Sequence, residues 1–129
     1  MKYFWQKKIR MKTFTQQLVI TDSHTAAFMG SGNLEVFATP AMVAFMENTA
    51  IQTIDDLEEG YTTVGIEINI QHLKATRVGE TVSCTATLVQ HVKRLYEFSI
   101  TASNANGELI GTAGHKRVAV NIDKFMDAL

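Results

Sequence analysis

One acidic side chain interrupts an apolar stretch in the first half of the chain. Glu47 falls in a segment expected to be helical, where residues three and four positions away share its face. Those neighbours are all apolar: Val43, Ala44, Ala50 and Ile51. A carboxylate buried among such side chains is costly unless a cation or hydrogen-bond donors compensate, so Glu47 is a candidate for orienting or acid–base chemistry. The alternative is a helix edge, from which its carboxylate reaches solvent beside Asn48.

A histidine occupies an equally unusual place further along the chain. His72 ends a segment, residues 61–72, in which apolar and polar residues alternate. The apolar residues that share its parity are Val64, Ile66, Ile68 and Ile70. A regular strand would therefore point His72 toward the helix, where a carboxylate can position the imidazole for general acid–base catalysis. The alternative is a core histidine that only satisfies its own hydrogen bonds.

The third candidate is a hydroxyl at a helix start. Thr39 precedes Pro40, a pair typical of a helix N-terminus with threonine as the N-cap and proline at the first helical position. The same hydroxyl could also orient water, bind an oxyanion or act as a nucleophile. Glu47 follows about 12 Å further along the helix axis, so the two side chains are not expected to touch. A third group must bridge them, and His72 from the same or a facing subunit is the candidate.

Other polar residues carry weaker indications. His115 and Arg117 share one face of the last predicted strand and could bind a phosphate-bearing substrate, although such a pair more often lies on a solvated face. Cys84 lies on the apolar face of a strand, which favours an inert core thiol over a nucleophile. The 4 histidines are scattered and match no metal-binding spacing, so no metal site is expected.

Composition narrows the class of protein. With 129 residues, 46% of them hydrophobic and 19% charged, the chain suits one globular domain. A net charge of −1 excludes a broadly basic surface for nucleic acid, and a single cysteine excludes an internal disulfide. No apolar run is long enough to span a membrane, and no secretory signal is recognised, so we expect a cytoplasmic protein without membrane attachment. Residues 1–12 are expected to be a flexible extension and residues 13–129 the single domain.

The elements that position these residues follow from the pattern. The start at Thr39 predicts one long helix that runs to Glu58 or Glu59 and ends at Gly60. Its first half is apolar on all sides and must therefore be wrapped by other elements. Strands are predicted over residues 12–20, 61–72, 81–92, 95–102 and 108–122.

These elements predict an α+β fold. Consecutive strands joined by short turns pair antiparallel, so we expect an antiparallel sheet that curls round one long central helix. A sheet with one covered face and exposed edges often pairs with a second copy, and a symmetric homodimer is therefore expected. The sequence leaves open whether such dimers pair further into tetramers.

Several segments together are similar to a known family. The stretch LEVFATPAMVAFMENTA, residues 34–50, resembles the helix region of the fluoroacetyl-CoA-thioesterase-like branch of hotdog-fold thioesterases. The stretch VGIEINIQH, residues 64–72, resembles the strand that follows in that branch. The tail residues GHKRV at 114–118 and DKF at 123–125 also fit, so the resemblance extends over nearly the whole chain.

The resemblance implies a hotdog fold, a dimer with active sites at the subunit interface, and hydrolysis of acyl-CoA thioesters. The catalytic threonine, glutamate and histidine of the branch fall on Thr39, Glu47 and His72. Its carbonyl-binding glycine and its substrate-side arginine fall on Gly65 and Arg117. We expect His72 to act as general base and acid, Glu47 to orient it, and Thr39 to attack the carbonyl or hold the attacking water. Such a mechanism needs no metal or organic cofactor, because CoA is part of the substrate.

One segment departs from that branch. The fluoroacetyl-specific member has a phenylalanine-lined lid before the helix, whereas residues 30–34 here are Gly-Ser-Gly-Asn-Leu. A different or broader short acyl group is therefore expected. Two other functions stay open: a non-catalytic acyl-CoA-binding hotdog module, and a hotdog acyl-CoA hydratase or dehydratase, although the Asp and His pair of such enzymes is not found near the helix start.

Overall fold

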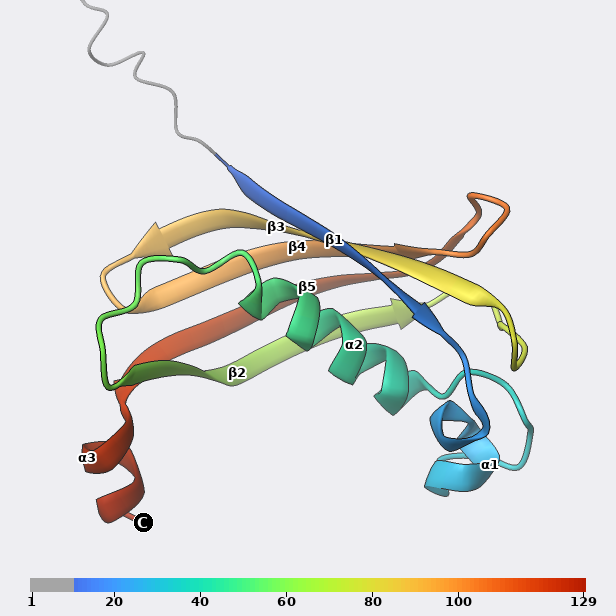
Figure 1. The fold of residues 1–129 in the computed structure, drawn as a ribbon, viewed down its shortest axis with the longest axis horizontal. Coiled ribbons are helices and arrows are strands. Elements are labelled where there is room, and N and C mark those ends of the chain that lie inside the picture. Colours follow the sequence, from blue (N-terminus) through green and yellow to red (C-terminus); the bar gives the residue numbers. More distant parts are fainter. Residues whose placement is uncertain (1–10) are drawn as a thin grey trace, which may run out of the picture.

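The computed structural model describes residues 11–129. The predicted extension, residues 1–12, therefore lies almost entirely outside the described residues, and Lys12 is already the first residue of a strand. The described helices and strands, shown in Figure 1, are in chain order β1 (Lys12–Val19), the short 3₁₀ helix η2 (Asp22–His24), α1 (Ala26–Met29), α2 (Thr39–Ile51), β2 (Tyr61–His72), β3 (Thr81–Val92), β4 (Leu95–Ser103), β5 (Leu109–Asn121) and α3 (Ile122–Asp127).

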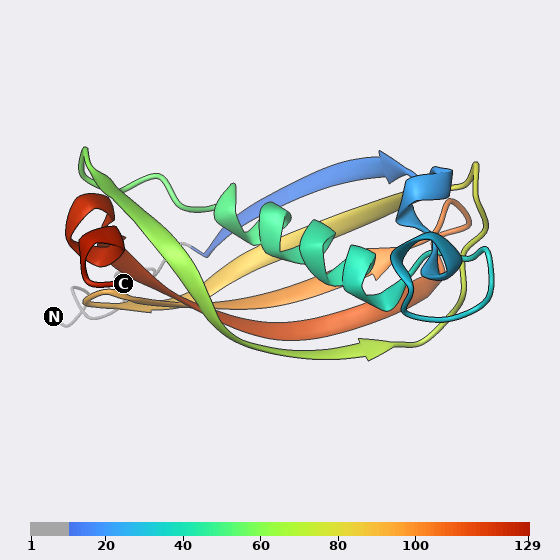
Figure 2. The same cartoon turned by 90° about the horizontal axis from the view of Figure 1, so that it is seen from below.

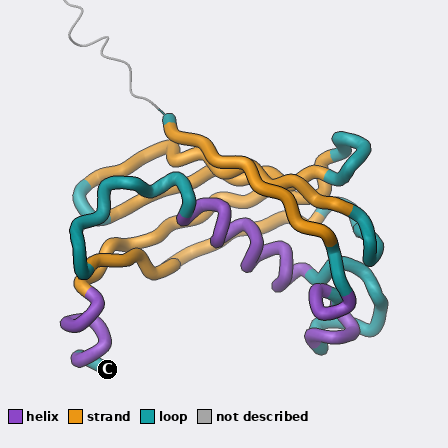
Figure 3. Tube along the Cα trace, in the orientation of Figure 1, coloured by secondary structure: helices purple, strands orange, loops and turns teal. Residues whose placement is uncertain are grey.

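The five described strands form one antiparallel sheet that curves around α2. The strand order is β1-β3-β4-β5-β2, so β1 and β2 are the two edges. Seen from below, α2 lies along the hollow of the sheet (Figure 2). The helices α1 and α3 lie near opposite ends of the molecule, as the tube in Figure 3 also shows. The predicted α+β architecture is confirmed. No helix of the described residues has both the length and the apolar character that crossing a membrane requires.

The core lies between α2 and the sheet. Met42, Met46 and Ala50 are fully buried, and their spacing of four residues places them on one face of the helix. The sheet contributes Val82, Cys84, Ala86, Phe98 and Ile100 to the same core, so the cysteine is buried as predicted. A Cβ on Gly111 of β5 would lie 2.5 Å from Cε of Met42, so the glycine leaves room for the end of the Met42 side chain between the helix and this strand.

The start of α2 differs from the prediction. Ala38 is the N-cap residue, with an extended backbone, and Thr39 is the first residue of the helix. The predicted N-cap role of Thr39 is wrong, because its hydroxyl bonds to His72 and not to a helix amide. Pro40 is tolerated next to it because an amide in the first turn of a helix has no partner within the helix.

The helix also ends earlier than predicted, at Ile51 and not near Glu58. Gln52 is the C-cap residue, and the hydroxyl of Thr53 donates to the carbonyl oxygen of Ala50 over 2.8 Å. That bond satisfies a carbonyl at the helix end and competes with continuation of the helix. The predicted end signal, Gly60, has φ 86° and instead lies in the turn that leads into β2.

The edge strand β2 contains a bulge that its alternating sequence did not predict. Pairing with β5 shifts between Gly65 and Glu67, so the intervening Ile66 is an extra residue. Because side chains of a strand alternate between two faces, one extra residue exchanges those faces. Ile66, which has the parity of the predicted buried face, is consequently 56% exposed.

The bulge divides β2 into two halves of opposite parity. Before it, Thr63 is buried while Val64 is only partly so, which is the reverse of the predicted pattern. After it, Ile68, Ile70 and His72 are the partly buried residues, as their parity predicted. The bulge therefore lets both Thr63 and His72 face the inner side of the sheet although their sequence parity differs.

Candidate active site

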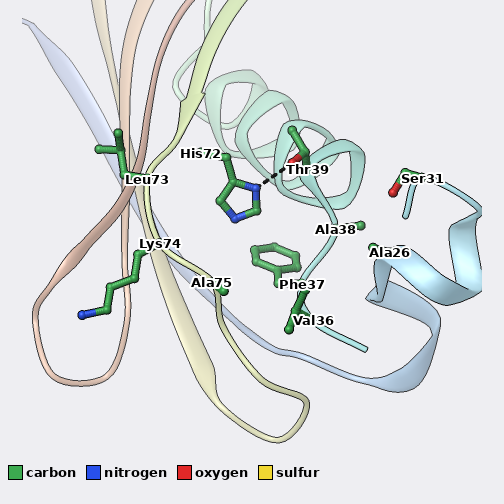
Figure 4. Close-up of a pocket in the computed structure, with 10 residues that line it drawn as sticks. All are labelled: Ala26, Ser31, Val36, Phe37, Ala38, Thr39, His72, Leu73, Lys74 and Ala75. Atoms are coloured by element: carbon green, nitrogen blue, oxygen red, sulfur yellow. Dashed lines mark hydrogen bonds between the residues drawn. The ribbon is translucent and has the colours of Figure 1, made fainter. Parts of the chain in front are cut away.

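Thr39 and His72 meet where α2 begins and β2 ends. Oγ1 of Thr39 lies 2.7 Å from Nδ1 of His72, and Figure 4 shows this hydrogen bond. The buried ring of Phe37 stands nearly perpendicular to the imidazole, with ring centroids 6.4 Å apart. The first turn of the helix and the last residue of the strand thus bring a hydroxyl and an imidazole into contact. These are two of the three predicted catalytic residues Thr39, His72 and Glu47.

The other ring nitrogen of His72 lacks a partner among the described residues. Nε2 is buried and makes no hydrogen bond. Burial lowers the pKa of His72 from its ordinary 6.5, which favours the neutral ring. When the Thr39 hydroxyl donates to Nδ1 of a neutral ring, Nε2 carries the proton. The backbone of Lys74 lies close enough to raise the pKa of the ring, against the larger effect of burial, but it makes no hydrogen bond to Nε2, which stays open to a further acceptor.

A cavity of about 330 Å³ opens beside the pair. Most of its lining side chains are small or apolar, as Figure 4 shows: Ala26, Val36, Ala38, Leu73 and Ala75. Two polar residues, Ser31 and Lys74, complete the wall, and Nζ of Lys74 is held 2.6 Å from the carboxylate of Glu108. A small apolar group can therefore lie next to the Thr39 hydroxyl.

Glu47 does not contact His72 within the protomer. Its Oε2 lies 3.8 Å from Nη1 of Arg117 and 3.9 Å from Nε2 of His115, both on β5. Its side chain is 35% exposed, so the carboxylate is neither fully buried nor fully solvated. The predicted contact between Glu47 and His72 is thus not made inside one chain.

Arg117 and His115 are buried, so the expectation of a solvated face is wrong. Arg117 donates from Nε to Oγ1 of Thr63 over 2.8 Å and from Nη2 to the backbone oxygen of Thr63 over 3.0 Å. The bulge in β2 turns Thr63 toward these side chains. The parity of β5 did not distinguish the two faces, because Ala113 and Ala119 share the face of His115 and Arg117 while Val118 and Val120 share the opposite face.

Gly65 forms the floor beneath these polar groups. A Cβ at this position would lie 3.0 Å from Oε2 of Glu47, 3.2 Å from Nη1 of Arg117 and 3.3 Å from Cε1 of His115. The missing side chain is therefore what lets the three groups approach the backbone at the bulge. The predicted carbonyl-binding glycine lies beside the predicted glutamate and arginine.

The five predicted site residues consequently form two half-sites in one protomer. Thr39 and His72 make one, and Glu47, Gly65 and Arg117 make the other. Along β2, His72 is about 23 Å from Gly65, at about 3.3 Å per residue. No group of three or more His, Cys, Asp or Glu residues within residues 11–129 is arranged to hold a metal ion.

Residues 20–123 match the family model of the fluoroacetyl-CoA-specific thioesterases. The chain belongs to this family. Within the family, a fluoroacetyl-CoA thioesterase of Streptantibioticus cattleyicolor is 35% identical over 92 residues, which are 70% of this chain and 66% of that protein. The matched region therefore spans slightly less than two thirds of that relative.

Solved structures of this thioesterase family and of a more distant protein share the fold. The fluoroacetyl-CoA thioesterase FlK superposes with a TM-score of 0.86 at 28% identity, over 94% of this chain and 95% of that one. A mutant of FlK has also been solved with fluoroacetate and CoA. A hot-dog-like protein from Thermanaerovibrio acidaminovorans superposes with a TM-score of 0.82 at 21% identity, over 99% of this chain and 94% of that one. The predicted hotdog fold and family are confirmed.

Proposed function

We propose that this protein hydrolyses a short-chain or otherwise small acyl-CoA to the free acid and CoA. The observation that carries the proposal is the Thr39–His72 pair, a hydroxyl bonded to a partly buried imidazole beside a cavity of about 330 Å³. Membership of a thioesterase family supports the reaction, and the complex of FlK with CoA supports a CoA ester as the substrate.

Two copies of the chain would complete the site through the free edge of β2. Antiparallel pairing about a twofold axis midway between Gly65 and His72 sets Gly65 of one protomer opposite His72 of the other. Because Glu47 lies directly over Gly65, its carboxylate would then approach Nε2 of His72 across the interface. The same axis builds both sites, so the proposed unit is a homodimer with two active sites. Whether such dimers pair into tetramers stays open.

In the proposed site a hydroxyl, an imidazole and a carboxylate act in proton transfer as in a hydrolase triad. His72 accepts the hydroxyl proton of Thr39 at Nδ1 while its Nε2–H donates to Glu47 of the partner subunit. The attacking oxygen is either Oγ1 of Thr39 or that of a water held by it. As that oxygen bonds to the thioester carbon, its proton moves to Nδ1, and the carboxylate stabilises the imidazolium that forms.

The remaining steps return the proton and release the products. The backbone N–H of Gly65 donates to the oxyanion of the tetrahedral intermediate, with Arg117 on the substrate side. The C–S bond then breaks, and the leaving thiolate of CoA takes the proton from Nδ1 of His72. If Thr39 was the nucleophile, a water repeats the sequence on its acyl ester. Either route consumes one water and yields one acid and one CoA, and neither calls on a metal or organic cofactor.

Residues 30–34, which precede α2, affect which acyl groups the cavity can accept. Of residues 30–34, only Ser31 lines the cavity, so no aromatic side chain from this segment narrows it. The small residues of this segment leave room for short acyl groups other than fluoroacetyl, while Phe37 and Leu73 limit the length of the acyl chain. We place the reaction in the cytoplasm, which suits a chain whose single cysteine, Cys84, is a buried free thiol.

A substrate panel tests the reaction. The full chain is incubated with acetyl-, fluoroacetyl-, propionyl-, isobutyryl-, hexanoyl- and crotonyl-CoA, and the released thiol is measured. Release of CoA from the shorter esters is expected. Tight binding without release would instead support the non-catalytic module, and hydration of crotonyl-CoA without release would support the hydratase.

A mixing experiment tests the shared site. Thr39→Ala and Glu47→Gln variants are each nearly inactive in this scheme, but a mixed dimer has one site with both changes and one with neither. Equal amounts, exchanged to equilibrium, should recover about a quarter of the wild-type activity. Recovery of none would contradict a site shared between protomers.

A further inference from the structure

His115 is a buried histidine whose two ring nitrogens both have partners. It is 2% exposed, and its ring stacks on Phe98 of β4 with centroids 5.6 Å apart. Nδ1 lies 2.7 Å from the backbone oxygen of Glu67 at the bulge, and Nε2 lies 3.2 Å from Nη1 of Arg117. The ring therefore joins the bulge of β2 to the guanidinium group on β5.

The chemistry of these partners determines where the proton of His115 lies. A backbone carbonyl can only accept, so Nδ1 must carry the hydrogen that points at Glu67. A guanidinium can only donate, so Nε2 must be unprotonated to accept from Arg117. Burial lowers the pKa of His115, which agrees with a neutral ring. His115 is thus the Nδ1–H tautomer, with Nε2 as a hydrogen-bond acceptor.

Nη1 is the nitrogen of Arg117 that Thr63 does not hold. Nε and Nη2 of Arg117 are both held by Thr63. Nη1 lies 3.2 Å from Nε2 of His115 but 3.8 Å from Oε2 of Glu47, which is too long for a hydrogen bond. A shift of less than about 1 Å would give Nη1 a direct bond to that carboxylate. Nη1 carries two hydrogens, and the bond of one of them to His115 holds this nitrogen at a distance from which it makes no hydrogen bond to Glu47.

We propose that His115 is a positioning residue that holds Nη1 of Arg117 and thereby keeps the carboxylate of Glu47 available to His72 of the partner subunit. This inference rests on the proposed function, since it concerns the residue that orients the catalytic imidazole. Without the acceptor at Nε2, Arg117 turns to Glu47 and forms a direct ion pair. That ion pair draws the carboxylate toward Arg117 and away from His72 of the partner subunit, so kcat falls while KM for the acyl-CoA changes little.

The same arrangement makes the site sensitive to protonation of His115. The groups that face the ring are Arg117 on β5, Glu47 on α2, the carbonyl of Glu67 on β2 and the apolar ring of Phe98 on β4. A proton on Nε2 replaces the acceptor by a second donor, so the bond to Arg117 is lost. Activity should therefore fall on the acid side through two protonations, on His72 and on His115.

Two substitutions of His115 distinguish the contribution of the Nε2 acceptor from that of the Nδ1 donor. His115→Gln places an acceptor near the position of Nε2 that does not titrate, whereas His115→Asn keeps a donor for Glu67 and loses the acceptor. We expect His115→Asn to lower kcat about 10- to 100-fold with little change in KM. His115→Gln should recover most of that loss and should show a shallower acid limb than the wild type. Equal losses of kcat in both variants, matched by equal losses of Tm, would show a structural role only and overturn the proposal.

A double-mutant cycle tests whether the effect passes through Glu47. In a Glu47→Gln background, His115→Asn should change kcat by less than about threefold, because the carboxylate it protects is already gone. A loss as large as in the wild-type background would overturn the proposal.

Nitrogen NMR of the His115 ring gives a readout that needs no substrate. The Nδ1–H tautomer is expected at pH 7, and an Nε2–H tautomer or an imidazolium would overturn the proposal. A wild-type protein without thioesterase activity would contradict the proposed function alone, and the spectrum would still decide whether His115 presents its acceptor to Arg117.

Discussion

Thr39 and His72 are 33 positions apart in the sequence, and their side chains form a hydrogen bond of 2.7 Å in the fold. The bond joins the first turn of α2 to the last residue of the edge strand β2. Each residue lies at an element end, where the backbone is less constrained than in mid-helix or mid-strand. The hydroxyl–imidazole pair is therefore complete within one protomer, whereas Glu47 lies elsewhere, beside Gly65 and Arg117.

Removing the imidazole tests its role as general base. His72→Ala should lower kcat/KM about 10²–10⁴-fold, the usual contribution of a positioned acid–base group. The matched control is His24→Gln, which changes a histidine outside both half-sites and should leave turnover close to wild type. Near-normal turnover in His72→Ala would refute the assignment.

The hydroxyl of Thr39 is tested by a pair of substitutions. Thr39→Ala should lower kcat about 10²-fold or more, while Thr39→Ser keeps the hydroxyl and should retain most activity. Equal losses in the two variants would mean that the methyl group, and not the hydroxyl, matters. Mass spectrometry of rapidly quenched reactions then separates the two routes, because only a nucleophilic Thr39 gains the mass of the acyl group.

The pH dependence of catalysis reports on the carboxylate. A general base works in its neutral form, so kcat/KM should be constant above the pKa of His72 and fall below it. In the proposed dimer, the negative charge of Glu47 would stabilise the imidazolium and raise that pKa. Glu47→Gln should therefore move the acid limb to lower pH as well as lower the plateau. A limb that stays in place would contradict a position of Glu47 beside His72.

A methyl group at Gly65 tests the half-site formed by Glu47, Gly65 and Arg117. In Gly65→Ala the new Cβ would lie 3.0 Å from the carboxylate of Glu47 and 3.2 Å from the guanidinium of Arg117, so both must move. Displacement of these groups should lower kcat about 10²-fold. Gly114→Ala on β5 is the control, because a Cβ there meets nothing within 4 Å. Circular dichroism should show the same fold in both variants.

Protein stability should also depend on the buried histidine His115. Burial lowers the pKa of His115 from the ordinary 6.5, which the unfolded chain retains. As pH falls past about 6.5, the unfolded state binds more protons than the native state, so the free energy of unfolding decreases. This stability is complete above that pH and is lost below it. Tm should fall between pH 7 and 5, and His115→Gln should reduce the slope; an unchanged slope would contradict a neutral buried His115.

The sequence by itself determined the α+β fold, the family and the identity of the candidate residues. A helix apolar all round in its first half must be wrapped, and strands joined by short turns pair antiparallel, so the architecture followed from local patterns. Glu47 and His72 were recognisable because each is a polar residue among apolar neighbours of the same face. That kind of signal depends only on spacing along one element.

Contacts between elements were decided by the tertiary structure. The strand period predicted Ile66 to be buried, but the extra residue in β2 exchanged the two faces and turned Thr63 toward Arg117. A bulge depends on how two strands pair, and periodicity along one strand does not contain it. The same reason explains why His115 was expected on a solvated face: its neighbours come from β2, β4 and α2, which only the folded chain brings around it.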